Sequence, residues 1–179
     1  CSRFKYAGYT PDWINVTDPK LWLKNLRNAF VKGGQIVQKK ADSITLKSDT
    51  TIVRCSGEEF PASYVVIAAG AWSKSLAQSI GDKFPLDTER GYNTTFNSGV
   101  FKLQTHLTFA DHGFVISRIG DNIRVGGAVE LGGLNAPPNF ARSRILLSKA
   151  RQFLPNMKVS NATDWMGFRP SMPDSLPVI

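Results

Sequence analysis

The spacing of apolar residues in the first part of the chain predicts one amphipathic helix. Within residues 16–34, apolar side chains recur at three- and four-residue intervals, which places them on one face of a helix. Asp18 is a suitable N-cap, and Pro19 suits the first helical position. Gly33 and Gly34 are typical of a helix C-terminus. We therefore expect a helix that begins and ends inside this segment.

Shorter apolar runs after this helix predict strands. Polar turn residues separate the candidate strands 35–40, 43–47 and 51–54. Residues 64–70 form a continuous apolar run, which is typical of a strand covered on both faces in a parallel α/β sheet. A second helix is predicted over residues 73–80.

A different pattern begins near residue 84. Short strands with closely spaced turns predict an antiparallel sheet that includes a hairpin over residues 113–129, turning around Gly120. A third helix is predicted over residues 141–154, and a further strand over residues 162–166. The change of pattern predicts a mixed fold, with an α/β part first and an α+β part of antiparallel strands and a covering helix second.

The composition narrows the classes of protein. The chain has 22 basic and 14 acidic residues, a net charge of +8, spread out rather than clustered. No groove-reading motif accompanies this charge, so we expect no nucleic-acid partner. Cys1 and Cys55 match no disulfide framework and no metal-ligand spacing, which favours a cytoplasmic protein without a metal site.

Small residues follow the long apolar run and mark a candidate binding turn. Ala69, Gly70 and Ala71 would let a ligand approach the backbone, and the following helix would offer free N–H groups to an anion. A tight strand-to-helix turn needs small residues for packing as well, and this alternative is the more common one.

Two polar side chains are further candidates. Arg169 stands between aromatic, glycine and proline residues, so it could bind a carboxylate through two parallel hydrogen bonds from a rigid apolar pocket. A surface arginine or a structural ion pair is an equal alternative. Tyr92 could point its phenol into a site, but a local ion pair between Glu89 and Arg90 is the favoured explanation of that segment.

Several segments match known enzymes in the same order along the chain. They are VVIAAGAWS at residues 65–73, TERGY at 88–92, NIRVGGAVE at 122–130, and WMGFRP with PDSLPVI between 165 and 179. Together they resemble the FAD-dependent D-amino-acid dehydrogenases and the related glycine and sarcosine oxidases.

This resemblance implies a two-lobed flavoprotein. Residues 1–82 would be the middle part of a Rossmann-like FAD-binding domain, residues 83–166 a substrate domain with a mostly antiparallel sheet, and residues 167–179 the return into the FAD-binding domain. The glycine-rich N-terminal FAD motif and the family's C-terminal end have no counterpart in this sequence. We therefore expect a fragment that holds no FAD and is inactive by itself.

The resemblance also implies site residues. Arg169 would hold the substrate carboxylate, Tyr92 would belong to the same catalytic site, and the backbone of Ala41 would contact the FAD adenine. The remaining cofactor-binding candidates are Ala69, Gly70, Ala71, Trp72 and Gly167.

The implied activity is oxidative deamination of a D-amino acid by hydride transfer to FAD. The implied partners are the D-amino acid and a respiratory electron acceptor, with peripheral association of the complete enzyme with the inner membrane from the cytoplasmic side. Two alternatives stay open. One is a glycine or sarcosine oxidase-like enzyme on the same scaffold, and the other is a non-catalytic α/β module that binds an anion or a protein.

Overall fold

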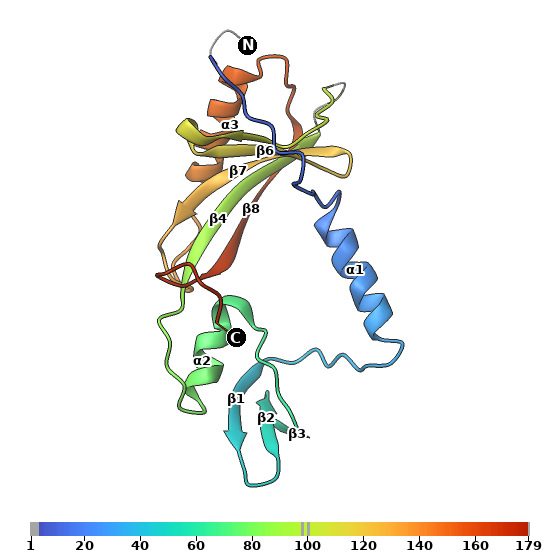
Figure 1. Ribbon diagram of the computed structural model, residues 1–179, viewed down its shortest axis with the longest axis vertical. Coiled ribbons are helices and arrows are strands. Elements are labelled where there is room, and N and C mark those ends of the chain that lie inside the picture. Colours follow the sequence, from blue (N-terminus) through green and yellow to red (C-terminus); the bar gives the residue numbers. More distant parts are fainter. Residues whose placement is uncertain (1–3, 98, 100, 179) are drawn as a thin grey trace. The chain divides into compact units, whose positions relative to one another are not determined.

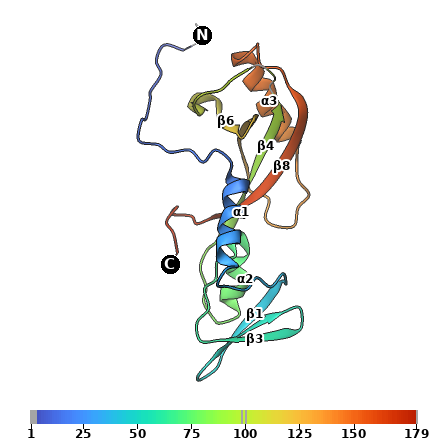
Figure 2. The ribbon, with the colours of Figure 1, turned by 90° about the vertical axis from the view of Figure 1, so that its right-hand side faces the viewer.

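The computed structural model describes residues 4–97, 99 and 101–178, and it separates into two compact units. Unit 1 comprises Cys1–Gly34, Gly91–Val129 and Pro137–Gly167. Unit 2 comprises Gln35–Arg90, Glu130–Ala136 and Phe168–Ile179. Figures 1 and 2 show the elements of both units along the chain.

Helix α1 (Pro19–Phe30) confirms the first predicted helix. The Asp18 carboxylate accepts hydrogen bonds from the N–H groups of Lys20 and Leu21 at 2.9 and 3.0 Å, which satisfies two of the free donors of the first turn. At the other end, the Gly34 N–H donates to the Phe30 carbonyl at 2.8 Å. No residue of α1 is buried.

A small antiparallel sheet opens unit 2, with strand order β1-β2-β3. Strands β1 (Ala41–Leu46) and β2 (Thr51–Cys55) confirm two predicted strands. The predicted strand over residues 35–40 is wrong, because this segment is irregular and the first strand begins only at Ala41.

Strand β3 (Glu58–Ala62) was not predicted. Its first residue, Glu58, pairs with Cys55 across a two-residue loop. Ser56 and Gly57 both have positive φ, 51° and 85°. That backbone is typical of a tight β-hairpin, so the polar residues that predicted only a turn connect two strands.

The predicted strand over residues 64–70 is wrong for the described structure. The segment belongs to no sheet, and Tyr64 and Val66 are 92% and 87% exposed. An apolar run becomes a strand only beside another strand that takes up its backbone hydrogen bonds, and the described residues offer none. The 3-10 turn η1 (Gly70–Trp72) and helix α2 (Ser73–Gln78) follow directly and confirm the second predicted helix.

Helix α2 packs against the small sheet. Leu76 and Ala77 are buried, and beyond the helix the Ser79 hydroxyl accepts from the Ile44 N–H at 2.8 Å. The same hydroxyl lies 3.2 Å from the Ile44 carbonyl. This contact fixes the end of α2 to strand β1.

The larger sheet has the strand order β5-β6-β7-β4-β8. Strands β6 (Phe114–Ile119) and β7 (Asn122–Glu130) form the predicted hairpin, because Ile119 pairs with Asn122. Strands β4 (Asp87–Asn97) and β5 (Leu107–Phe109), and the 3-10 turn η2 (Ala110–His112), complete this region with β8.

Helix α3 (Ala141–Phe153) confirms the third predicted helix and lies against one face of the sheet (Figure 1). Their shared core consists of apolar side chains from the strands, the helix and the adjoining loops. Its buried members are Phe96, Leu103, Phe114, Ile116, Ile123, Val125, Leu146, Ala150 and Met157.

Strand β8 (Ser160–Ser171) is longer than predicted. Gly167, Arg169 and Pro170 therefore lie within a strand and not in a loop after it. Proline cannot donate to a ladder, but β8 is at the edge of the sheet, where proline is tolerated.

The mixed α/β fold with antiparallel sheets is confirmed. The predicted domain boundaries are at 82/83 and 166/167. Near them, the chain passes from unit 2 to unit 1 at Arg90/Gly91 and from unit 1 to unit 2 at Gly167/Phe168. Residues up to Gly34 cluster with the antiparallel sheet and not with residues 35–82. The assignment of an FAD-binding and a substrate domain to these segments stays a prediction.

Candidate functional site

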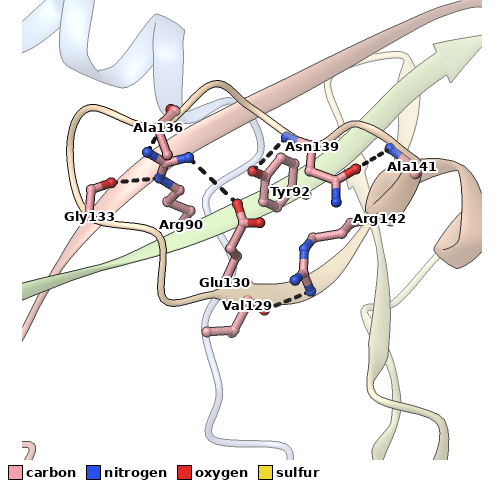
Figure 3. A network of polar contacts seen from close by, with 9 residues as sticks. All are labelled: Arg90, Tyr92, Val129, Glu130, Gly133, Ala136, Asn139, Ala141 and Arg142. Carbon is pink, nitrogen blue, oxygen red and sulfur yellow. Dashed lines mark hydrogen bonds and ion pairs between the residues drawn. The ribbon is translucent and has the colours of Figure 1, made fainter.

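A buried arginine, Arg90, makes several polar contacts within unit 2. The Arg90 side chain is fully buried (0% exposed) and lies on β4. Its Nε donates to the Gly133 carbonyl at 2.6 Å and its Nη2 to the Ala136 carbonyl at 2.7 Å. Its Nη1 lies 3.6 Å from Oε2 of Glu130 (Figure 3). The guanidinium therefore holds both ends of the loop from Glu130 to Ala136.

The carboxylate beside Arg90 is that of Glu130. The predicted local ion pair between Glu89 and Arg90 is therefore wrong. Successive side chains of a strand point to opposite faces, which separates Glu89 from Arg90. A buried charge is costly unless it is paired and hydrogen-bonded, and Arg90 has both kinds of partner. Gly132 leaves room for the guanidinium, because a Cβ there would lie 3.2 Å from Cζ of Arg90.

Phe168 links this arginine to the small-residue turn. Cζ of Arg90 lies 5.5 Å from the centre of the Phe168 ring, within the range of a cation–π contact. On the same ring, Trp72 packs edge-on, with centroids 5.4 Å apart and planes at 72°. Phe168 therefore contacts both Arg90 and Trp72, the last residue of η1.

The turn itself has two reasons for small residues. Gly70 has φ of +56°, a conformation that favours glycine, and a Cβ there would meet no atom within 4 Å. Ala71 is 7% exposed, so packing limits its size. Gly70 is exposed, which leaves its backbone open to the approach of a ligand.

A cavity of about 300 Å³ adjoins this turn within unit 2. Thr88 is 2% exposed, and its Oγ1 has no hydrogen-bond partner among the described residues. The cavity is lined from η1, α2, β4 and the loop after β7, and its lining includes Ala71, Trp72, Thr88, Leu134 and Asn135.

Arg169 lies near the C-terminal end of β8, and its side chain is exposed. Because successive side chains of a strand alternate in direction, half-buried Phe168 and Arg169 point to opposite faces of β8. The expectation of a guanidinium enclosed in an apolar pocket is therefore wrong for the described residues. The role of Arg169 as a carboxylate ligand stays a prediction.

Tyr92 makes a structural contact within unit 1. Its side chain is 1% exposed, and its hydroxyl accepts a hydrogen bond from the Asn139 N–H at 3.0 Å (Figure 3). The side-chain oxygen of Asn139 in turn accepts from the Ala141 N–H at 3.2 Å, at the start of α3. The ring packs edge-on against Phe140, with centroids 6.1 Å apart. Tyr92 thus anchors the beginning of this helix.

The two outlying cofactor candidates lie in strands. Ala41 is half-buried at the start of β1, where it pairs with Cys55 beside a bulge. Gly167 is half-buried in β8 and is covered by the indole of Trp165, which would clash with any Cβ. The clashing atoms are the far edge of the exposed Trp165 indole, which could move aside, so neither contact tests cofactor binding.

The described residues contain no group of three or more His, Cys, Asp or Glu side chains arranged to hold a metal. No local pattern predicts these contacts of Arg90, because Glu130 and Ala136 lie forty or more residues away along the chain. Gly132 is the local sign that a bulky group approaches this loop, whereas Gly133 has a φ of +60° and open space around it.

The family model of FAD-dependent oxidoreductases matches residues 1–179, the whole chain. The chain belongs to this family. The predicted family resemblance is thereby confirmed, and membership implies FAD as the cofactor of the complete enzyme.

Relatives of this FAD-dependent oxidoreductase carry related names. The chain is 34% identical to a D-amino-acid oxidase of Bradyrhizobium diazoefficiens over 99% of its length and 44% of the oxidase. It is 34% identical to a D-amino acid dehydrogenase of Paramagnetospirillum magneticum over 64% of this chain and 28% of the dehydrogenase. Among solved structures, glycine oxidase from Geobacillus kaustophilus matches with a TM-score of 0.70 and 25% identity, over 81% of this chain and 40% of that one.

This FAD-dependent oxidoreductase chain spans less than half the length of the curated relatives that it matches. At the Gly70 turn the backbone is exposed and a Cβ would point into open space, so the residues present leave room for a cofactor. The roles of Ala69, Gly70, Ala71 and Trp72 as FAD contacts stay a prediction.

Proposed function

We propose that the complete protein catalyses the oxidative deamination of D-amino acids with FAD. The D-amino-acid oxidase relative, aligned over 99% of this chain, and the D-amino acid dehydrogenase relative support this substrate class. The observation that carries the proposal is the contact of Phe168 with Trp72, because Phe168 precedes Arg169 on β8 and Trp72 ends the turn that we propose for the cofactor.

Arg169 binds the substrate carboxylate in this proposal. Its planar guanidinium matches a carboxylate with two parallel hydrogen bonds, and its exposed side chain is free to reach a ligand. Fixing the carboxylate orients the α-carbon and its hydrogen, which contributes to the rate through proximity. FAD, when bound, supplies the hydride acceptor.

The substrate amine binds in its neutral form in this proposal, so no protein base is needed. The α-carbon gives a hydride to FAD and the amino nitrogen gives a proton to solvent water, which leaves an imino acid. Water then hydrolyses the imino acid to a 2-oxo acid and ammonia. Tyr92 is the weaker catalytic candidate, because its hydroxyl already accepts a hydrogen bond from the Asn139 N–H.

The remaining contacts with the cofactor belong to the proposal as well. The backbones of Ala69, Gly70 and Ala71 in η1 and before it would pass close to the cofactor, and the backbone of Ala41 at the start of β1 would contact its adenine. Trp72 in η1 and Gly167 in β8 are the other proposed cofactor contacts.

We further propose a respiratory electron acceptor and peripheral association with the inner membrane from the cytoplasmic side. The net charge of +8 supports attraction to an anionic lipid surface. Among the described residues, no helix has the length and apolar character to cross a membrane.

A glycine oxidase-like activity is the second candidate, and the structural match to the Geobacillus kaustophilus glycine oxidase favours it. Steady-state assays of the purified complete protein with D-amino acids, L-amino acids, glycine and sarcosine separate the candidates. We expect flavin in the purified protein and 2-oxo acid and ammonia from D-amino acids. Preference for glycine or sarcosine would favour the second candidate. A flavin-free protein without turnover would indicate a binding module.

A further inference from the structure

We infer that Arg90 is a positioning residue for the proposed carboxylate site, acting on Arg169 through Phe168. The inference rests on the proposed function, because it needs Arg169 as the carboxylate ligand. All the contacts that carry it lie within unit 2.

One side of the Arg90 guanidinium is fixed by backbone. Its Nε and Nη2 donate to the carbonyls of Gly133 and Ala136 at 2.6 and 2.7 Å, and these carbonyls cannot move without moving the loop. Glu130 at 3.6 Å offsets its charge, and the Glu130 side chain is itself only 18% exposed. The plane of the guanidinium is therefore set by groups that are not part of β8.

The Phe168 ring rests against this fixed plane. Arg90 lies 5.5 Å from its centre, and Trp72 approaches the same ring from the cofactor turn at 5.4 Å. Arg169 is the next residue of β8, so the position of its Cα follows from where Phe168 is held. Arg90 and Trp72 therefore add to the pairing of β8 with β4 in fixing where the Arg169 side chain starts.

These contacts require an arginine. Only a guanidinium carries enough donors in one plane to reach two carbonyls and a carboxylate while it also lies over an aromatic ring. A lysine keeps the charge but has one nitrogen and no flat face. The change Arg90→Lys therefore separates charge from geometry.

The competing explanation is that Arg90 only stabilises the fold. In that case a variant lowers the melting temperature and the yield, but the folded enzyme binds substrate as before. A positioning role changes the KM for the substrate and the Kd for a simple carboxylate, with a smaller effect on kcat, because the carboxylate is bound in the ground state and the transition state alike.

The experiment uses the complete flavoprotein with the variants R90K, F168L and R169A. Arg118 offers a matched control, because its Nε also donates to a backbone carbonyl, that of Gly120 at 2.8 Å, and its Nη2 lies 3.5 Å from Asp121. Unlike Arg90, the Arg118 side chain is 59% exposed, and it lies on β6, where Arg118 pairs with Ile123. The control variant is R118K.

The measurements are KM and kcat for D-alanine, the Kd for acetate from the perturbed flavin absorbance, and hydrogen exchange of the peptides that cover residues 130–136 and 168–171. For R90K we expect KM and the acetate Kd to rise about 10-fold with kcat changed by less than about 3-fold, since small misplacements near a site have large effects. F168L should reproduce this change. Exchange should rise in both peptides for R90K and in neither for R118K.

The outcomes separate the inference from the proposed function. If R169A raises KM but R90K and F168L leave KM and the acetate Kd unchanged, Arg90 is not a positioning residue. If R169A itself has no effect, Arg169 is not the ligand, and both fail. Should R90K not fold, F168L alone decides, because it retains the loop contacts of Arg90.

Discussion

Removal of the Arg169 guanidinium is the perturbation that we expect to change substrate binding most. In the variant Arg169→Ala, the substrate carboxylate loses two charge-assisted hydrogen bonds. Hydrogen bonds to charged groups contribute about 1.5–3 kcal/mol each. Arg169 is exposed, so solvent screening reduces this value, and the lower end of the range applies.

We therefore expect a loss of about 3 kcal/mol, which corresponds to an increase in KM on the order of 100-fold. The value of kcat should change by much less, because the carboxylate is held equally before and during the transfer of the hydride. Arg169→Lys keeps the charge without the planar fork, and we expect it to recover part of the loss, on the order of 10-fold.

The assay is steady-state oxidation of D-alanine by the complete flavoprotein with an artificial electron acceptor. D-alanine amide is the diagnostic second substrate, because it lacks the carboxylate. The unmodified enzyme should prefer the acid to the amide, and Arg169→Ala should lose most of this preference. Arg144→Ala, which removes an exposed arginine from α3, is the control.

A KM for D-alanine within about 2-fold of the unmodified value in Arg169→Ala would refute the reasoning, since the estimate rests on a bidentate contact. An unchanged preference for acid over amide would refute it independently. Loss of bound flavin in this variant without a change in KM would instead make Arg169 a cofactor contact.

Two further changes address the turn and Tyr92. Gly70→Ala should lower the free energy of unfolding by about 1 kcal/mol, because φ of +56° strains a residue with a Cβ. It should also lower the flavin content of the complete enzyme. Gly33→Ala, at a glycine without positive φ, is the matched control for both the denaturant titration and the flavin quantification. Tyr92→Phe should destabilise the protein by about 1 kcal/mol through loss of the acceptor for the Asn139 N–H, with kcat unchanged. A large fall in kcat with intact stability would instead assign the phenol to catalysis.

Local patterns were sufficient where the neighbours in sequence supply the interactions. Helix α1 was predicted because its cap, Asp18, and its closing glycine lie within a few residues of its ends. The β6–β7 hairpin was predicted for the same reason, since a two-residue turn sets its register.

Patterns failed where distant residues decide the structure. The apolar run at residues 64–70 predicted a buried strand, yet a strand exists only with partners, and the described residues supply none. The sequence predicted a weak local ion pair between Arg90 and Glu89, although the partners of Arg90 come from the loop that begins forty residues later. The exposure of Arg169 depends on the length of β8, and the boundaries of elements are set by pairing and not by local sequence.

The most direct test of the proposed activity is the anaerobic half-reaction of the purified complete protein. Its flavin absorbance is recorded while D-alanine, L-alanine, glycine or sarcosine is added in the absence of any electron acceptor. We expect D-alanine to bleach the flavin and to yield one equivalent of 2-oxo acid per flavin, whereas L-alanine leaves the spectrum unchanged. Bleaching by L-alanine, or by glycine and sarcosine in preference to D-alanine, would contradict the proposed function.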